Sequence, residues 1–246
     1  MAVLKMDRWG LKVGAGQPLL VIAGLNVLED DALAIETAQT LKAICQRLDL
    51  PFVFKASFDK ANRSSIKSYR GPGLEAGLKT LARVKAEVNV PIATDLHEPA
   101  QAEPVAAVAD LVQIPAFLVR QTDLVVAAAR ATRAADGWLH VKKAQFLAPW
   151  DCANIVSKIK EATEDAEFTL LCERGSSFGY NNLVVDMLGM AEMKKLGVPV
   201  TIDATHAVQL PGADSRNGVT STGGRRDGVP LIAKAAVAAG ADGVFL

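Results

Sequence analysis

Short runs of apolar residues alternate along the chain with longer segments in which apolar residues recur at helical spacing. The first such pair joins an apolar run at Leu19–Ala23 to a helical pattern at Glu29–Leu48, in which Leu33, Leu41 and Ile44 fall on one face. Short, nearly continuous apolar runs are typical of strands buried on both faces of a parallel sheet. Seven more follow the first: Phe52–Ser57, Ile92–Leu96, Leu111–Ala116, Leu139–Ala144, Phe168–Glu173, Val198–Ala204 and Ala241–Leu246.

Helical patterns lie between these runs. They are Leu74–Val88, Thr122–Ala135, Cys152–Ala162, Leu183–Leu196 and Val229–Ala239. Strands that alternate with helices predict a parallel sheet covered by helices, and eight such units within 246 residues favour a closed (β/α)8 barrel, the TIM barrel. We therefore expect a single α/β domain over residues 1–246.

The two ends of the sequence add to this picture. Residues 3–18 have the pattern of two short strands around Trp9-Gly10, so an N-terminal β-hairpin is expected within residues 1–18. The sequence ends at Leu246, with the eighth predicted strand, and the last loop and helix of the barrel are not in it. We expect them in a longer natural chain.

Charge and composition narrow the classes of partner. Lys plus Arg equals Asp plus Glu at 27 each, so no overall charge draws the chain to nucleic acid or to an anionic membrane surface. No apolar run approaches the ~20 residues that span a bilayer, and the N-terminus has no secretory apolar segment. Cys45, Cys152 and Cys172 are scattered, which favours reduced thiols. We expect a cytoplasmic protein, with no nucleic acid and no membrane as partner.

One stretch, Phe52–Gly73, begins as an apolar strand and becomes a dense set of cations, hydroxyls and amides. Its cations are Lys55, Lys60, Arg63, Lys67 and Arg70, and its hydrogen-bonding neighbours are Ser57, Asn62, Ser64 and Ser65. These groups suit phosphate oxygens. The alternative is a solvated basic loop. Lys55 argues against that alternative, because it lies inside the apolar run, where an unpaired ammonium is costly.

Active sites of such barrels lie at the C-terminal ends of the strands. The polar residues that follow the predicted strands are Asn26, Lys55, Ser57, Lys60, Asn62, Arg63, Ser64, Asp95, His97, Gln113, Arg120, Lys142, Lys143, Glu173, Arg174, Asp203, His206 and Gln209. Lys55, Lys142 and Arg174 should converge on one pocket, which implies a polyanion such as a phosphate beside a carboxylate. The group from Asn62 to Ser64 suggests a second phosphate.

Several of these residues have a structural alternative. Asp95 and Asp203 could cap helices, His206 could be a hydrogen-bonded core histidine, and Lys142-Lys143 could be an exposed strand end. The segment from Thr205 to Arg226 is long and contains four glycines. Its length predicts a loop that acts as a mobile lid over a substrate.

Several motifs together resemble one enzyme family. They are Lys55–Gly73, Thr94-Asp-x-His-Glu-Pro99, Gln113-Ile-Pro-Ala-Phe-Leu118, Cys172-x-Arg-Gly175 with Phe178-Gly-Tyr180, Val184-Val-Asp-Met187 and Asp203-x-Thr-His206. Over nearly the whole chain they resemble the 3-deoxy-D-manno-octulosonate 8-phosphate synthases. That resemblance implies a homotetrameric (β/α)8 enzyme that condenses phosphoenolpyruvate with D-arabinose 5-phosphate and releases phosphate, on the route to the inner-core sugar of Gram-negative lipopolysaccharide.

The resemblance also implies residue roles. Phosphoenolpyruvate would be held by Lys55, Ser57, Lys60, Gln113, Ala116, Lys142 and Arg174. Arabinose 5-phosphate would be held by Asn62, Arg63, Ser64, Asp95, Phe117, Gln209 and, from a neighbouring subunit, Arg120. The catalytic group would be Lys60, His206, Asp95 and Asn26, with Lys60 and His206 handling protons.

Asn26 indicates whether the reaction requires a metal ion. Related synthases divide into a class in which a Cys at this position joins a His, a Glu and an Asp around a divalent ion, and a metal-independent class with Asn there. This chain has Asn26, and an amide is a poorer transition-metal ligand than a thiolate. We expect no metal and no other cofactor.

Three other functions stay open at this stage. A 3-deoxy-D-arabino-heptulosonate 7-phosphate synthase would use the same donor with erythrose 4-phosphate, but its acceptor loop usually reads Pro-Arg-Thr-Ser where this chain has Asn62-Arg-Ser-Ser65. A class I aldolase would form a Schiff base on Lys55 or Lys142. A phosphometabolite-binding protein would bind without turnover.

Overall fold

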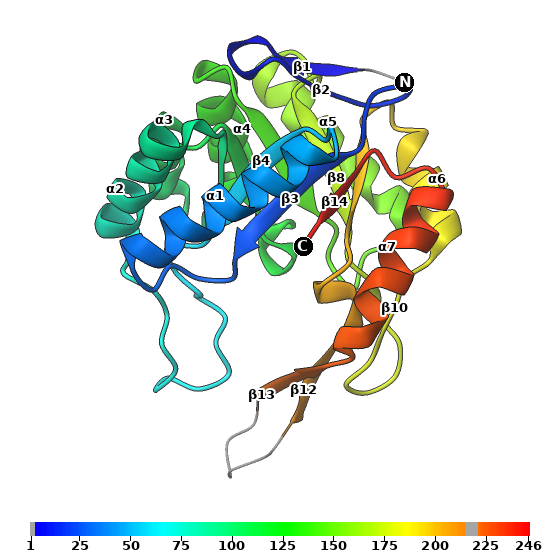
Figure 1. Ribbon diagram of the computed structural model, residues 1–246. Coiled ribbons are helices and arrows are strands. Elements are labelled where there is room, and N and C mark those ends of the chain that lie inside the picture. Colours follow the sequence, from blue (N-terminus) through cyan, green and yellow to red (C-terminus); the bar gives the residue numbers. More distant parts are fainter. Residues whose placement is uncertain (1–2, 215–220) are drawn as a thin grey trace.

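Eight parallel strands close into a barrel in the computed structural model, which describes residues 3–214 and 221–246 (Figure 1). In the order of the ring they are β3 (Leu20–Leu25), β4 (Phe52–Ala56), β5 (Ile92–Asp95), β6 (Leu111–Ile114), β7 (Trp138–Lys142), β8 (Thr169–Glu173), β11 (Val200–Asp203) and β14 (Gly243–Phe245). The ring closes where β14 pairs with β3. The predicted TIM barrel and each of its eight strands are confirmed.

Helices surround the barrel. They are α1 (Asp31–Arg47), α2 (Leu74–Val84, continued by a π turn at Lys85–Asn89), α3 (Ala102–Val108), α4 (Thr122–Ala134), α5 (Cys152–Thr163), α6 (Met187–Lys194) and α7 (Val229–Ala238). Short 3-10 turns lie at Asp7–Trp9, Pro99–Gln101, Ala116–Leu118, Pro149–Asp151, His206–Val208 and Arg226–Gly228. Among the described residues, no helix is both long and apolar enough to cross a membrane.

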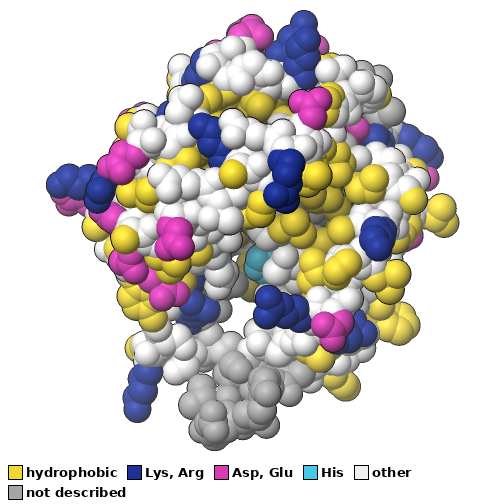
Figure 2. Space-filling view, viewed as in Figure 1, with side chains coloured by type: hydrophobic (Ala, Val, Ile, Leu, Met, Phe, Trp, Pro, Cys, Tyr) yellow, Lys and Arg dark blue, Asp and Glu magenta, His cyan; other side chains and the backbone are white. Residues whose placement is uncertain are grey.

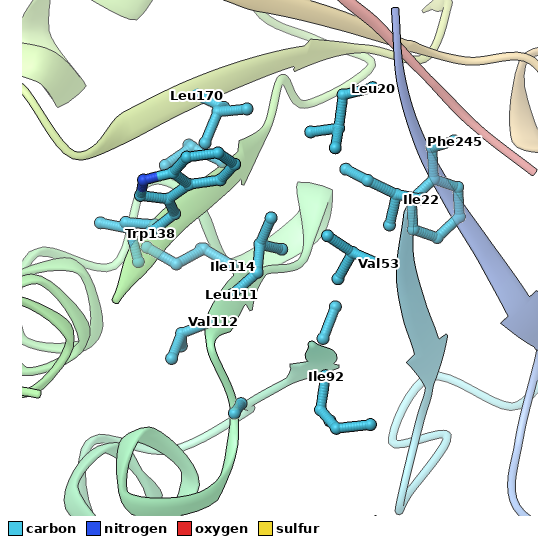
Figure 3. Close-up of a cluster of buried hydrophobic side chains, with 14 of the residues drawn as sticks. Leu20, Ile22, Val53, Ile92, Leu111, Val112, Ile114, Trp138, Leu170 and Phe245 are labelled. Atoms are coloured by element: carbon cyan, nitrogen blue, oxygen red, sulfur yellow. The ribbon is translucent and has the colours of Figure 1, made fainter. Parts of the chain in front are cut away.

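The core fills the barrel and the layer between barrel and helices. Leu20, Ile22 and Val53 are fully buried, and Figure 3 shows them gathered with Ile114 and Leu170 from other strands. All five residues of β4 are buried, and so are all five of β7 and of β8. Burial on both faces is the reason that these strands read as continuous apolar runs.

The predicted N-terminal hairpin is present. Strands β1 (Leu4–Met6) and β2 (Leu11–Val13) pair antiparallel across the end of the barrel at which its strands begin (Figure 1). The indole nitrogen of Trp138, at the start of β7, donates to the Lys5 carbonyl at 3.1 Å. The hairpin therefore covers the end of the barrel opposite to the candidate site.

Two predicted segments differ from the structure. Leu183–Leu196 is not one helix: strand β10 (Leu183–Val184) pairs with β9 (Ser176–Ser177), and α6 begins at Met187. The reason is Asp186, whose carboxylate accepts from the Leu188 N–H at 3.0 Å and caps the helix.

Within the predicted loop at Thr205–Arg226, the structure has an antiparallel ribbon of β12 (Gln209–Asp214) and β13 (Ser221–Gly224). It extends away from the barrel on the side opposite to the hairpin (Figure 1). No alternating pattern in the sequence reveals these strands, because Gly and Pro occupy several of their positions. Residues 215–220 of the predicted lid lie outside the described residues.

Candidate active site

A cavity of about 610 Å³ lies at the C-terminal ends of the barrel strands. It brings together the predicted residues Asn26, Lys55, Lys60, Asn62, Arg63, Ser64, Asp95, Gln113, Ala116, Phe117, Lys142, Arg174, His206 and Gln209. Pro211 and Thr222 of the β12–β13 ribbon form part of its wall. Figure 2 shows a hollow with a histidine ring and Lys or Arg side chains beside it.

Among the residues to which the resemblance gives a role with a substrate, two are not in the cavity wall; of the other candidates, Lys143 and Glu173 also lie outside it. Ser57 is fully buried behind the wall, between Lys55 and Asp95. Arg120 is exposed and does not line the cavity. Ser57 therefore acts on the cavity through its neighbours.

Lys55 has a buried counterion. Its ammonium lies 3.2 Å from Asp95 Oδ1 and donates to the Ser57 hydroxyl, which in turn donates to Asp95 Oδ1 at 2.5 Å. The other Asp95 oxygen is 3.3 Å from His97 Nε2. Burial opposes ionisation of Asp95, but Lys55, His97 and Lys60 outweigh it and hold the pKa of this carboxyl well below its ordinary value. Asp95 is therefore a carboxylate, and it is what makes a buried Lys55 tolerable.

A second buried pair lines the same cavity. Lys142 Nζ donates to Asp203 Oδ2, and the same carboxylate accepts from the His206 backbone N–H at 2.8 Å. His206 Nδ1 is 2.8 Å from Asp203 Oδ2, which leaves Nε2 as the ring nitrogen that can meet a ligand. Asp203 thus shapes its turn as a cap residue would, and it also orients two cavity side chains.

Burial lowers the pKa of His206, although Asp203 opposes this, so the neutral imidazole is favoured. The ring of Phe245 lies beneath this group, with Lys142 Nζ 3.4 Å from its centroid and the His206 ring 6.0 Å away. An aromatic face attracts an ammonium, so Phe245 holds Lys142 in place from below.

Lys60 differs from both paired lysines. Burial, followed by the positive charges of Lys55 and Lys142, lowers its pKa to about 7, while Asp95 raises it. At neutral pH it therefore exchanges a proton readily. A side chain with this property suits general acid–base work and binding of an anion.

Arg174 and two glutamines present polar atoms to the cavity region. Arg174 Nη2 donates to Gln209 Oε1 at 3.0 Å. Its Nη1, together with Gln113 Oε1 and Gln145 Oε1, is buried without a hydrogen-bond partner among residues 3–214 and 221–246. Buried polar atoms are nearly always paired with protein, water or ligand, so a polar ligand in the cavity is the natural partner.

The group from Asn62 to Ser64 lies on the β4–α2 loop and lines the outer part of the same cavity. Hydrogen bonds within the loop fold it back: the Lys60 N–H donates to the Arg70 carbonyl at 2.7 Å, and Arg63 Nε donates to the Tyr69 carbonyl at 3.0 Å. The loop thus carries a second cation, Arg63, to the cavity rim.

Sequence reasoning missed two cavity residues that matter. Nothing marks Phe245 as a site residue, because it is one apolar residue in an apolar strand. Gln145 could have been found, since it is a polar residue close behind the fifth predicted strand. Within the described part of the chain, no three His, Cys, Asp or Glu side chains are grouped so that they could hold a metal ion.

Comparison with known proteins identifies the family. The DAHP synthetase I family matches residues 3–246. This chain is a member of that family. Curated relatives named 2-dehydro-3-deoxyphosphooctonate aldolase include those of Hahella chejuensis (52% identical over 237 residues, 96% of this chain and 81% of the relative) and Acinetobacter baumannii (56% over 229 residues, 93% and 77%).

The relative with that name from Marinobacter nauticus is 50% identical over 246 residues, which are 100% of this chain and 84% of the relative. The name is a synonym of 3-deoxy-D-manno-octulosonate 8-phosphate synthase, so the resemblance seen in the motifs is confirmed.

Proposed function

We propose that this chain condenses phosphoenolpyruvate with D-arabinose 5-phosphate and water to give 3-deoxy-D-manno-octulosonate 8-phosphate and inorganic phosphate. The observation that carries the proposal is the cavity, in which Lys55, Lys60, Lys142 and Arg174 meet the Asn62–Ser64 loop. Relatives that are 50–56% identical bear the name of this activity. The product class makes the reaction a step towards the lipopolysaccharide inner-core sugar.

The inner cations would hold phosphoenolpyruvate. Its carboxylate and phosphate present several acceptor oxygens, and Arg174 can donate to two oxygens at once in the planar geometry of a guanidinium. Gln113 and the backbone near Ala116 lie on the same wall, and Ser57 positions Lys55 from behind. Arabinose 5-phosphate would place its phosphate at Asn62, Arg63 and Ser64.

The chemistry needs three proton transfers and no covalent enzyme intermediate. As the enol carbon of phosphoenolpyruvate attacks the aldehyde carbon, protonated Lys60 can give its proton to the aldehyde oxygen. Neutral His206, held by Asp203, can take a proton from the water that adds to the resulting oxocarbenium carbon. As the C–O bond to phosphate breaks in the tetrahedral phosphate ester, its hydroxyl becomes the ketone carbonyl and gives up its proton, which leaves with the phosphate; the surrounding cations stabilise the phosphate charge.

We propose that this reaction requires no metal. Asn26 lines the cavity where the metal-dependent class has a Cys, and its amide oxygen is a weak ligand for a transition metal. Asn26 would instead hydrogen-bond a substrate or the attacking water.

We also propose a cytoplasmic homotetramer. Large apolar side chains are exposed on the segments that follow the neighbouring strands β6, β7 and β8: Phe117 (54% exposed), Phe146 (63%), Trp150 (66%), Phe178 (72%) and Tyr180 (98%). Aromatic residues gathered in this way are typical of subunit interfaces. Arg120 is exposed and lies three residues after Phe117, so burial of this region against a second copy would place Arg120 at the subunit interface.

Release of inorganic phosphate tests the function. The purified protein is incubated with phosphoenolpyruvate and arabinose 5-phosphate, with and without EDTA, and with erythrose 4-phosphate as the control acceptor. We expect release that depends on the five-carbon sugar and is unaffected by EDTA. Release with erythrose 4-phosphate alone would instead indicate the heptulosonate synthase, and loss with EDTA would overturn the role given to Asn26. A lysine trapped by borohydride would indicate a class I aldolase, and substrate binding without release would indicate a binding protein.

A further inference from the structure

Lys143 is a fully buried lysine that the proposed reaction does not use. Its Nζ donates to the Ser176 hydroxyl at 3.0 Å and lies 3.3 Å from the Leu147 carbonyl and 3.4 Å from the Ala144 carbonyl. Glu173 Oε2 is 3.5 Å away, and both side chains are at most 1% exposed. Neighbouring residues at a strand end point in opposite directions, so Lys142 reaches the cavity while Lys143 lies behind its wall.

Glu173 joins this lysine to the turn that follows β8. Its Oε1 accepts from the backbone N–H groups of Arg174 at 2.8 Å and Gly175 at 2.6 Å. Gly175 has a positive φ of +88°, which a residue with a side chain rarely adopts. The carboxylate therefore holds the backbone from which the Arg174 side chain enters the cavity.

The same ammonium also holds the segment that follows β7. Ala144 and Leu147, whose carbonyls face Lys143, flank Gln145, which lines the cavity. The Gln145 carbonyl accepts from the Ser177 N–H at 2.9 Å. The segments after β7 and β8 are therefore linked by this backbone hydrogen bond as well as by the Lys143 ammonium. Gln145 Oε1 and Arg174 Nη1 are buried atoms without a partner in the described structure. The Arg174 guanidinium and the amide nitrogen of Gln145 can donate to an anionic ligand, so the positions of these two side chains decide how such a ligand is held.

We propose that Lys143 is a positioning residue, whose buried ammonium joins the segments after β7 and β8 and so fixes Gln145 and Arg174 against the bound phosphoenolpyruvate. The inference rests on the proposed function for the identity of that ligand. Displacement of a binding group by about 1 Å can cost as much as 10²-fold in rate. Loss of the contacts made by the Lys143 ammonium should therefore change the kinetic constants measurably.

A similar pair at the other end of the barrel provides a matched control. Lys194 Nζ lies 3.0 Å from Asp242 Oδ1, and Asp242 Oδ2 accepts from the Val200 N–H at 2.8 Å. This pair also joins a lysine to a carboxylate that holds backbone, but neither residue lines the cavity. Loss of the Lys194–Asp242 ion pair should therefore lower the stability of the fold without changing substrate binding.

The experiment compares Lys143→Met, the double variant Lys143→Met/Glu173→Gln, and Lys194→Met. Steady-state phosphate release, calorimetric titration with phosphoenolpyruvate and the melting temperature are measured for each. Lys143→Met leaves a buried carboxylate without its cation and should lower the melting temperature. The double variant should recover most of that loss, because the amide that replaces the Glu173 carboxylate is uncharged and its oxygen can still accept from both N–H groups.

For the double variant we expect KM and Kd for phosphoenolpyruvate raised about 10-fold or more, with a smaller change in kcat. Lys194→Met should lower the melting temperature with KM unchanged. A double variant with wild-type KM and Kd would overturn the positioning role, as would a KM that follows the melting temperature in all three variants. Absence of turnover and of phosphoenolpyruvate binding in the wild-type protein would instead overturn the proposed function.

Discussion

At the residue scale, the cations of the cavity are of two kinds. Lys55 and Lys142 each face a buried carboxylate, Asp95 and Asp203, that already balances their charge. Lys60 and Arg174 line the cavity without an ion pair to a described carboxylate. The positive charge that attracts an anionic ligand therefore comes mainly from Lys60 and Arg174. Lys55 and Lys142 add hydrogen-bond donors at fixed positions.

Lys60 should set the alkaline limb of the pH profile. Its pKa of about 7 means that the cation is present below that pH and is lost as pH rises through it. We expect kcat/KM for phosphoenolpyruvate to fall with rising pH above about 7. In Lys60→Arg the charge persists, so this limb should move well above pH 7 even if the rate is lower. Lys79→Arg, on an exposed helix position, serves as the control and should keep the wild-type profile.

Asp95 should matter for both folding and rate. Asp95→Asn leaves Lys55 buried without its counterion, which costs about 3–5 kcal/mol in the free energy of unfolding. The substitution would also lower the pKa of Lys55 further, since burial already lowers it and Asp95 is the main group that raises it. Phosphate release should fall by about 10²-fold or more.

The control for this change is Asp59→Asn. Asp59 pairs with Arg70, whose side chain is 56% exposed, so water screens the pair and the expected loss of stability is far smaller than for Asp95→Asn. Urea unfolding of both variants measures the difference. Equal stabilities would contradict the role given to Asp95 as a buried counterion.

Sequence could predict which residues meet in the cavity but not how they pair. That Lys55 and Asp95 both lie near the C-terminal ends of strands is readable, because each is close to the end of a mostly apolar run. That they lie 3.2 Å apart depends on the register of β4 and β5, in which Lys55 is opposite Ala93. Register between distant strands leaves no local mark in a sequence, so the role of Asp95 as the counterion of Lys55 could not be predicted.

At the element scale, one carboxylate fastens the N-terminal hairpin to the barrel. Asp110, which directly precedes β6, accepts from the Trp9 indole at 2.8 Å and lies 3.0 Å from Arg8 and 2.9 Å from Lys85. Its other oxygen accepts from the Ile92 N–H at 2.9 Å. Asp110 thus ties the hairpin, α2 and the start of β5 together, far from the cavity.

Asp110→Asn should loosen the hairpin without touching the chemistry. The amide keeps an acceptor but loses two ion pairs, so we expect a loss of about 1–3 kcal/mol in stability and an unchanged KM. Thermal unfolding and phosphate release check both parts. Asp165→Asn removes a surface pair with Arg133 and should cost at most about 1 kcal/mol. A raised KM in Asp110→Asn would show that the hairpin acts on the site.

The elements that sequence failed to predict are short or rich in glycine. Helix α3 has seven residues, too few to display a helical period. The two residues of β10 are apolar and lie close before the apolar start of α6. Only the capping residue Asp186 marks the boundary between the strand and the helix. Long regular elements could be predicted because their period is repeated several times.

At the scale of the whole molecule, the exposed aromatic side chains after β6, β7 and β8 predict assembly. Trp150→Glu would place a charge in the proposed interface, which should shift the protein from tetramer to smaller species in sedimentation. Phosphate release should fall as the tetramer dissociates, because the Arg120 side chain proposed to bind arabinose 5-phosphate comes from a neighbouring subunit. Leu48→Glu, at the exposed end of α1, is the control. A wild-type monomer, or a Trp150→Glu tetramer, would contradict the proposed interface.

Closure of the barrel and completion of the site are the same event. Gly243 pairs with Leu20 and Val244 with Val21, so the seam of the ring joins residues from opposite ends of the sequence. Phe245, which supports Lys142, comes from that seam. Contacts of such long sequence separation form late, because the entropy of closing the loop between them must be overcome first. During synthesis on the ribosome, therefore, a nascent chain can fold many of its strands and still bind no substrate until the final strand has emerged.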